Sequence, residues 1–278
     1  MKIYGILGTP YCGSTSLTFI ISGAKCVFPI GESIHINNKS KCSVCVDKPC
    51  PFWTKEFTEE ITQENIHKKV LEKVKQFGDF DIILYADKSP MIYESFKKLG
   101  TEFDKFFVLF KSPEAYMYSR LKHDKDNSEL MVKELDAYFQ VYSYKIFDSK
   151  NLFYLSYDDL TTNSVVVIKK LCEWADIPFD EKMLNLRLVG NKIHSISGNT
   201  GAYTHIWPKN FVKRFVKSKY WKDNFSKYHS EKALNESGKI IHDIRWKTGL
   251  TDKQKEIISA HKPSQDIYKT MLSKRLYI

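Results

Sequence analysis

The chain has 278 residues, with 43 Lys and Arg against 33 Asp and Glu, and a formal net charge of +10 at pH 7. Its 18 Phe, 16 Tyr and 5 Trp exclude an intrinsically disordered chain, because so many large apolar side chains drive burial. No apolar run approaches the ~20 residues that cross a bilayer, and no Pro/Gly/Ser-rich linker interrupts the sequence, so we expect one domain over residues 1–278 and no membrane partner.

The start of the chain and its six cysteines bear on the compartment. The first apolar run, residues 2–7, is too short for a signal peptide and ends at Gly8 rather than at a cleavage site. We therefore expect a cytoplasmic, reducing setting, in which cysteines stay thiols or bind a metal rather than form a disulfide framework. The positive charge favours an anionic ligand.

Four short apolar runs predict strands, at residues 2–7, 81–86, 106–110 and 152–156. Strands that are apolar at nearly every position are buried on both faces, as in a parallel sheet. A further strand that ends at Gly31 would bring the next residue towards the loop after the first strand.

Helical patterns separate these strands. Apolar residues at helical spacing predict helices over about 66–77, 130–146 and 166–174, and Ser112-Pro113 is typical of a helix start. The alternation predicts an α/β fold, a P-loop-like parallel sheet flanked by helices. From about residue 191 the chain is less regular, with a basic, aromatic stretch at 207–228 and a final helix near 252–260.

A turn rich in small and hydroxyl side chains follows the first strand. Backbone N–H groups at such a turn, with the dipole of the following helix, form a cradle for phosphate or sulfate. The candidate cradle residues are Tyr11, Cys12, Gly13, Ser14, Thr15 and Ser16. A plain Ser/Thr-rich helix start is the alternative. No Lys follows Gly13, so the turn is not a nucleotide-triphosphate P-loop, which disfavours a kinase or NTPase.

A cation stands at the end of the third apolar run. Lys111 follows residues 106–110, and Ser119 lies about two helical turns further on, where it could face the same way. The carboxyl ends of strands border the crevice in which α/β folds bind ligands. A solvated lysine is the alternative interpretation.

These segments together resemble the sulfotransferases that use 3′-phosphoadenosine 5′-phosphosulfate (PAPS). Residues 10–15 (Pro-Tyr-Cys-Gly-Ser-Thr) resemble the family's 5′-phosphosulfate loop, Lys111 with Ser119 its 3′-phosphate site, and residues 157–160 (Tyr-Asp-Asp-Leu) its Tyr-Glu-Asp-Leu segment. Two departures are Tyr11, where many relatives carry Lys or Arg, and Lys111 in place of Arg, which keeps the charge but not the bidentate geometry.

Three further segments resemble a bacterial branch of this family. They are Gly31-Glu32, residues 50–53 (Cys-Pro-Phe-Trp) and the loop 193–199, which ends in Gly-Asn but lacks the Arg that often follows. Within that branch the chain is similar to the cyanobacterial sulfotransferases that modify saxitoxin-type alkaloids. The resemblance implies the sulfotransferase fold, transfer of a sulfuryl group from PAPS to a hydroxyl or amine of a small-molecule acceptor, release of the desulfated donor (PAP), and no required metal.

The resemblance also implies catalytic roles. Glu32 is the expected general base, with His35 three residues on as its rival, and Lys88 is the expected electrophile on the sulfonate. Tyr157 would pack near the adenine or the 3′-phosphate. The alternatives are an exposed loop carboxylate, a solvated Lys88 paired with Asp87, and a core tyrosine.

Three cysteines are clustered at Cys42, Cys45 and Cys50. With His35 they could form a zinc site, but the spacing lacks the fourth ligand of a standard knuckle. We favour free thiols or an oxidised pair over a metal site here.

The stretch 207–228 interleaves lysines with aromatic residues. This pattern occurs in proteins that bind single-stranded nucleic acid, but it also fits an amphipathic helix with a solvated face. We favour the second interpretation, with part of the stretch covering the pocket, and expect no nucleic-acid partner. Phosphoryl transfer by a nucleotide kinase or NTPase, and non-enzymatic nucleic-acid binding, stay as the alternative functions.

Overall fold

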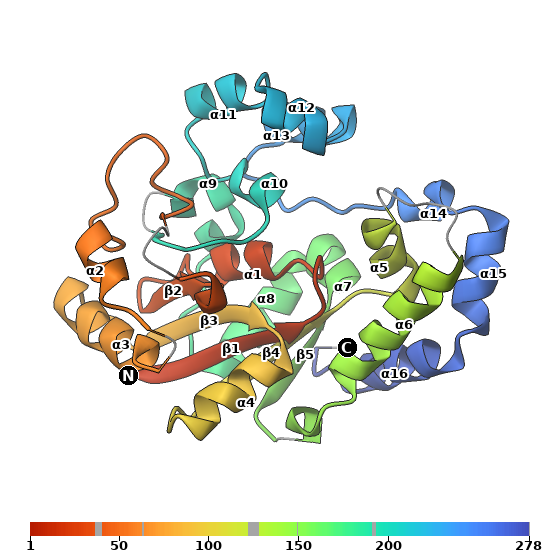
Figure 1. Ribbon diagram of the computed structural model, residues 1–278, viewed down its shortest axis with the longest axis horizontal. Coiled ribbons are helices and arrows are strands. Elements are labelled where there is room, and N and C mark those ends of the chain that lie inside the picture. Colours follow the sequence, from red (N-terminus) through yellow and green to blue (C-terminus); the bar gives the residue numbers. More distant parts are fainter. Residues whose placement is uncertain (37–40, 63, 122–127, 149, 191–192, 278) are drawn as a thin grey trace.

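A computed structural model describes residues 1–36, 41–62, 64–121, 128–148, 150–190 and 193–277. Five parallel strands form one sheet in the order β2-β3-β1-β4-β5 (Figure 1). The strands are β1 (Lys2–Gly8), β2 (Val27–Gly31), β3 (Ile82–Lys88), β4 (Lys105–Phe110) and β5 (Leu152–Ser156). Every predicted apolar run forms a strand and the expected strand before Glu32 is present, so the predicted parallel α/β fold is confirmed.

Helices cover both faces of the sheet (Figure 1). One face packs against α1 (Ser14–Ile21), α7 (Tyr157–Thr162) and α8 (Ser164–Ala175). The other packs against α3 (Ile66–Phe77), α4 (Pro90–Lys98), α6 (Ser128–Tyr142) and α16 (Lys262–Ser273). Ile6 and Leu7 of β1 are both fully buried, each in a different one of these two apolar clusters. Burial on both faces is why the strands are apolar at successive positions.

The remaining helices have nine residues or fewer. The α-helices are α2 (Lys55–Glu59), α5 (Pro113–Arg120), α9 (Leu186–Val189), α10 (Thr200–Tyr203), α11 (Lys209–Phe215), α12 (Lys219–Asn224), α13 (Lys227–Asn235), α14 (Trp246–Gly249) and α15 (Asp252–Ala260). The 3-10 helices are η1 (Ser33–His35), η2 (Lys145–Asp148) and η3 (Glu181–Leu184). Ser112 accepts a hydrogen bond from the backbone N–H of Ala115, as expected of the cap of α5.

Three helix predictions need correction. The helix predicted over 130–146 ends at Tyr142 as α6, and Ile146 lies in η2. The stretch 207–228 is not one amphipathic helix, because Ser218 caps a new helix by accepting from the Trp221 N–H. The helix near 252–260 is confirmed as α15, but it is not the last: His261 accepts from the Ser264 N–H and starts α16.

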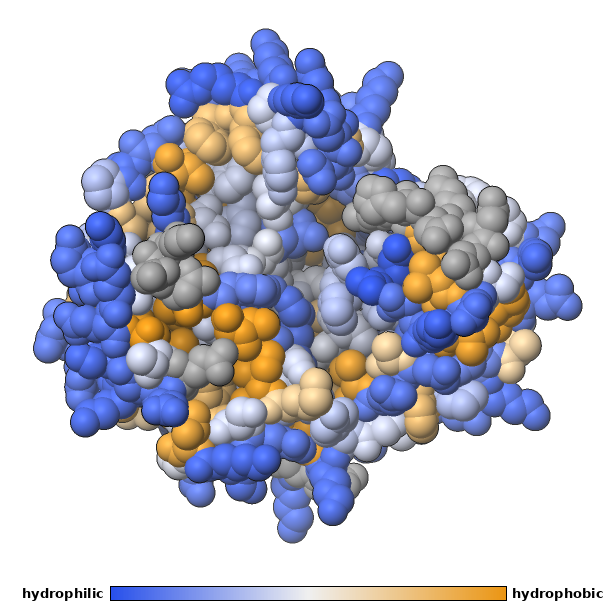
Figure 2. All heavy atoms as spheres, viewed as in Figure 1, coloured by the Kyte–Doolittle hydropathy of each residue, from blue (hydrophilic) through white to orange (hydrophobic). Residues whose placement is uncertain are grey.

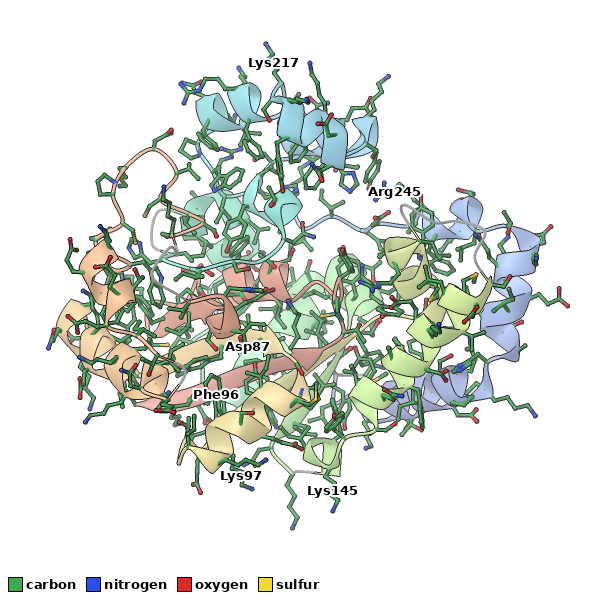
Figure 3. All side chains as sticks on the ribbon, in the orientation of Figure 1. Asp87, Phe96, Lys97, Lys145, Lys217 and Arg245 are labelled. Carbon is green, nitrogen blue, oxygen red and sulfur yellow. The ribbon has the colours of Figure 1, made fainter. Side chains whose placement is uncertain are left out.

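Hydrophilic side chains cover the outer surface of α11, α12 and α13 (Figure 2). Lys217, between α11 and α12, points away from the molecule, whereas Asp87 lies inside at the end of β3 (Figure 3). None of the described helices is both long and apolar enough to cross a membrane.

Candidate active site

A cavity of about 730 Å³ lies beyond the carboxyl ends of the strands. The strand order changes direction between β1 and β4, and ligands of α/β folds bind at such a point. Most of the predicted site residues line this one cavity. They are Tyr11, Gly13, Ser14, Thr15, Ser16, Glu32, Lys88, Lys111, Ser119 and Tyr157. The cavity therefore joins side chains from the loops after β1, β2, β3 and β4.

The loop between β1 and α1 forms one end of the cavity. Its backbone turns sharply, with positive φ at Tyr11 (63°) and Gly13 (102°). In the described part of the chain, no side chain caps α1, and the first N–H groups of any helix lack partners inside it. Asn199 donates its backbone N–H to Thr15 Oγ1 at 3.0 Å, which fixes the first turn of α1. This end can hold an anionic group.

Cys12 departs from the predicted cradle. Its side chain is fully buried, and it is not among the residues that line the cavity. Its backbone N–H donates to the Thr9 carbonyl at 3.3 Å and so closes the turn. Burial raises the pKa of the Cys12 thiol, which keeps it neutral. Cys12 therefore shapes the loop from below rather than facing a ligand.

Glu32 and Lys88 form an ion pair that opens onto the cavity. Lys88 ends β3, Glu32 follows β2, and these strands are neighbours, so Lys88 Nζ donates to Glu32 Oε1. The side chains are only 12% and 18% exposed. Ser197 Oγ donates to the other carboxylate oxygen at 3.2 Å. The alternative of an exposed loop carboxylate at Glu32 is thus wrong.

His35 also contacts the carboxylate of Glu32. Its Nε2 lies 3.2 Å from Glu32 Oε2, but its side chain is 53% exposed and does not line the cavity. The rival base thus lies behind Glu32, and the geometry favours Glu32 as the carboxylate that meets a ligand.

Asp87 supports this pair from below and does not pair with Lys88, contrary to the alternative interpretation. It accepts hydrogen bonds from Ser33 Oγ at 2.7 Å and from the Ile34 N–H at 3.1 Å. Burial raises the pKa of Asp87 to about 6, although these two hydrogen bonds oppose the shift. Asp87 thereby holds η1, which follows Glu32 directly, against the end of β3.

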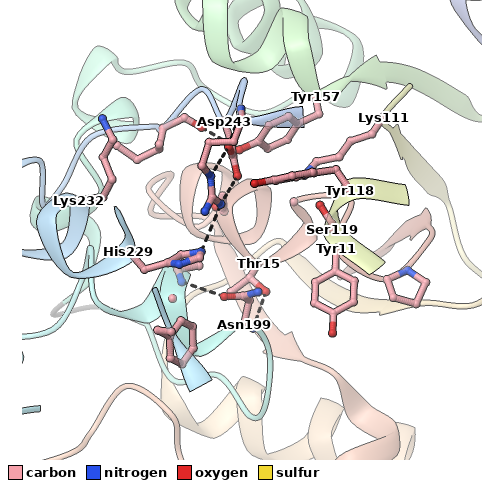
Figure 4. Close-up of a pocket in the computed structure, with 18 of the residues that line it drawn as sticks. Tyr11, Thr15, Lys111, Tyr118, Ser119, Tyr157, Asn199, His229, Lys232 and Asp243 are labelled. Atoms are coloured by element: carbon pink, nitrogen blue, oxygen red, sulfur yellow. Dashed lines mark hydrogen bonds and ion pairs between the residues drawn. The ribbon is translucent and has the colours of Figure 1, made fainter. Parts of the chain in front are cut away.

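Lys111, Ser119 and Tyr157 also line the cavity (Figure 4). Lys111 Nζ lies 4.1 Å from the ring centroid of Tyr157, within cation–π range. The Tyr157 hydroxyl donates to the Ile241 carbonyl at 2.7 Å, and burial raises the pKa of this hydroxyl, so Tyr157 stays neutral. A Cβ atom at Gly13 would lie 2.7 Å from the same ring. Tyr157 therefore links the two ends of the site.

One wall of the cavity, formed by the C-terminal part of the chain, was not predicted from the sequence. Asp243 accepts from Arg245 Nε at 2.8 Å and from Nη2 at 2.6 Å, and the guanidinium lies 4.0 Å from the Tyr228 ring centroid. These residues, with His229 and Lys232, line the cavity (Figure 4). They belong to no motif; only the basic, aromatic stretch before them indicated that this region could cover a pocket.

The aromatic side chains of that stretch pack inward. Phe211, Phe215 and Trp221 join the apolar cluster that includes α1 and α8. Trp221 stacks on Phe225 at 4.1 Å between ring centroids, and both line the cavity. The rings are thus used in packing, as expected of an amphipathic segment.

The cysteine cluster has a different fourth member from the one predicted. Cys42, Cys45 and Cys50 lie together with His194, not with His35. All six cysteines are unbonded, so the alternative of an oxidised pair is not seen. Trp53, which follows the cluster, is buried.

Comparisons with known proteins give similarity in structure alone. No family model and no curated protein matches the chain. The sulfotransferase domain of the Synechococcus PCC 7002 olefin synthase is similar, with a TM-score of 0.49, 15% identity, and 94% of each chain covered. The sulfotransferase domain from the curacin biosynthetic pathway has a TM-score of 0.47 and 13% identity, covering 93% of this chain and 96% of that one. Mouse sulfotransferase SULT7A1, solved with PAP, has a TM-score of 0.46 and 11% identity, covering 98% of this chain and 88% of that one.

Proposed function

We propose that the protein transfers a sulfuryl group from PAPS to a hydroxyl or amine of a small-molecule acceptor. One observation carries the proposal: the turn before α1, the Glu32–Lys88 pair and Lys111 all line the same cavity. PAPS carries a phosphosulfate at one end and a 3′-phosphate at the other. Its site therefore needs two separate groups of cations or N–H donors, one for each anionic end, and a base beside the acceptor. The motifs that resemble those of the sulfotransferase family support the same function.

The residues present suit such a donor. The N–H groups at the start of α1 and the hydroxyls of Ser14, Thr15 and Ser16 would hold the 5′-phosphosulfate. Lys111 and Ser119 would hold the 3′-phosphate, with Lys111 acting as a point charge. The cavity volume of about 730 Å³ is within the usual range for ligand pockets.

The chemistry balances with the residues at hand. The acceptor oxygen or nitrogen forms a bond to sulfur, the bond from sulfur to the bridging oxygen breaks, and PAP leaves with that electron pair. Glu32 takes the acceptor proton, a role worth ~100- to 10,000-fold in rate. Lys88 offsets the charge that develops on the bridging oxygen. Before the donor binds, Lys88 and Glu32 neutralise each other; an anionic donor that attracts Lys88 would free the carboxylate to act as a base.

Phosphoryl transfer is the main competing function. The loop has no Lys after Gly13, the residue that would grip a triphosphate. Thermal unfolding separates the two functions: PAP should raise the melting temperature strongly, whereas ATP with Mg²⁺ should not. The reverse result would support a kinase or NTPase.

Nucleic-acid binding, the other alternative, has less support because most of the aromatic rings at 207–228 are turned inward. It predicts tight binding of single-stranded RNA or DNA that weakens steeply with salt. Failure to see such binding would dismiss it.

The direct experiment is incubation of the protein with PAPS and a metabolite extract, followed by mass spectrometry. We expect one or more compounds to gain one SO₃, and saxitoxin-type alkaloids are the first acceptors to test because of the motif resemblance. The six unbonded thiols suit the reducing cytoplasm in which we place this reaction. Glu32→Gln protein is the matched control; equal SO₃ transfer by both proteins would remove Glu32 from the base role, and no transfer by the native protein to any acceptor would count against the function.

A further inference from the structure

We propose that Cys42, Cys45, Cys50 and His194 form a structural zinc site. The four ligand atoms, three Sγ and one imidazole nitrogen, all lie within 4.8 Å of one another. Three soft thiolates and an imidazole are the donor set of a closed, four-coordinate zinc site. The proposal stands on this cluster alone and does not depend on the proposed function.

The measured separations suit a tetrahedral ion. His194 Nδ1 lies 3.4 Å from Cys45 Sγ and 3.3 Å from Cys50 Sγ. With Zn–S near 2.3 Å and Zn–N near 2.0–2.1 Å, a tetrahedral site requires about 3.6 Å between sulfur and nitrogen. Both nitrogen–sulfur separations therefore lie within a few tenths of an ångström of the value that the ion requires. Four protein ligands leave no position for water, so the ion would be structural rather than catalytic.

Hydrogen bonds around the cluster hold two of the ligands in place. The backbone N–H of Trp53 donates to Cys50 Sγ at 3.2 Å. The indole Nε1–H of the same residue donates to the His194 carbonyl at 2.9 Å. Outer partners of this kind orient metal ligands and often matter for affinity. Phe77 packs edge-on against the His194 ring at 5.3 Å, which limits rotation of the imidazole.

The cluster joins two distant segments beside the candidate active site. Ser43 donates its N–H to the Ser195 carbonyl at 2.9 Å, and Cys42 forms an antiparallel bridge with Ile196. Ile196 in turn accepts at its carbonyl from the Glu32 N–H at 3.0 Å. Ser197, the next residue, donates to the Glu32 carboxylate. Zinc would thus fix the segment that positions the candidate base.

A disulfide explains the cluster less well. A disulfide would use two of the three sulfurs. It would not explain why the third thiol and the His194 imidazole lie in the same cluster. The convergence of all four donors is explained by one cation.

The test measures zinc in the native protein, purified in reducing buffer without chelator. Elemental analysis should find about one zinc per chain. Titration of metal-depleted protein with zinc chloride, against a chromophoric chelator, should show one tight site. Cys45→Ser should weaken zinc binding by at least ~10-fold. Cys26→Ser is the control, because Cys26 is a half-buried thiol outside the cluster, and it should bind zinc as the native protein does.

Several results would overturn the proposal. The first is native protein that retains less than about a tenth of a zinc per chain and gains none in the titration. The second is Cys45→Ser protein that binds zinc as tightly as Cys26→Ser protein does. The third is an intact mass two hydrogens below that of the reduced chain, which indicates a disulfide. If Cys45→Ser protein does not fold, the native titration still decides. PAP binding is measured separately, so failure of the zinc site and failure of the proposed function are distinguishable.

Discussion

At the scale of single residues, three side chains contact the carboxylate of Glu32. Lys88 and Ser197 donate to it, and His35 lies 3.2 Å away. The two candidate bases, Glu32 and His35, therefore contact each other. A single substitution of each residue is needed to distinguish their roles.

Glu32→Gln should lower turnover by ~100- to 10,000-fold, because the amide cannot take the acceptor proton. PAP affinity should stay within a few-fold, since Glu32 is not among the residues proposed to hold the two phosphates of PAP. His35→Gln is the control and should change turnover by less than ~10-fold. Steady-state kinetics and calorimetry check both variants. A larger loss in His35→Gln than in Glu32→Gln would transfer the base role to His35.

Lys111→Ala should weaken PAP binding by ~10- to 100-fold, because a charge-assisted contact to phosphate is lost. The affinity for adenosine 5′-phosphosulfate, which has no 3′-phosphate, should fall much less. Lys111→Arg keeps the charge and should recover most of the PAP affinity. Calorimetry with both ligands makes the comparison, and equal losses for the two would show that Lys111 does not contact the 3′-phosphate.

Asp87 should make the stability of the native protein depend on pH. Its pKa is raised by burial to about 6, above the usual value near 3.8. Between these values the native state binds more protons than the unfolded state, so the contribution is full below pH 3.8 and is lost as pH rises through 6. At ~1.4 kcal/mol per pKa unit, the change is about 3 kcal/mol.

Asp87→Asn removes this titration. Urea unfolding from pH 4.5 to 7.5 should show the variant gaining stability relative to native protein as pH rises. Asp81→Asn, which alters an exposed carboxylate just before β3, should run parallel to native protein. Parallel curves for Asp87→Asn as well would mean that Asp87 is not the source of the pH dependence.

At the scale of elements, the strands could be predicted because burial on both faces makes each one apolar throughout. The break between α11 and α12 could not be predicted, because a side chain that caps a helix competes with apolar periodicity. Ser218 ends the expected helix in this way, by capping α12.

The turn between β1 and α1 should tolerate no side chain at Gly13. Its φ is 102°, and a Cβ would lie 2.7 Å from the Tyr157 ring. Gly13→Ala should therefore lower the free energy of unfolding by more than the ~1 kcal/mol that left-handed backbone costs alone, and it should weaken PAP binding. Gly100→Ala is the matched control, since Gly100 also has positive φ (82°) but meets nothing within 4 Å. Denaturant titration of both variants tests this; equal losses would show that the Tyr157 contact is not tight.

At the scale of the whole molecule, the site is assembled from segments that are far apart in the sequence. Glu32, Lys88 and Lys111 each come soon after a predicted strand. The carboxyl edge of the parallel sheet was therefore expected to bring these three residues together. His194 could not be paired with Cys50, which lies 144 residues away, because no predicted strand edge places the loop that carries His194 beside the cysteines. The wall of Asp243 and Arg245 was missed for the same reason.

The proposed function requires one donor to span the cavity from the start of α1 to the end of β4. The decisive experiment is a crystal structure of the protein soaked with PAP. We predict the 5′-phosphate within hydrogen-bond distance of the N–H groups of residues 13–16 and the 3′-phosphate beside Lys111 and Ser119. PAP bound elsewhere, or with its two phosphates at the opposite ends, would contradict the account.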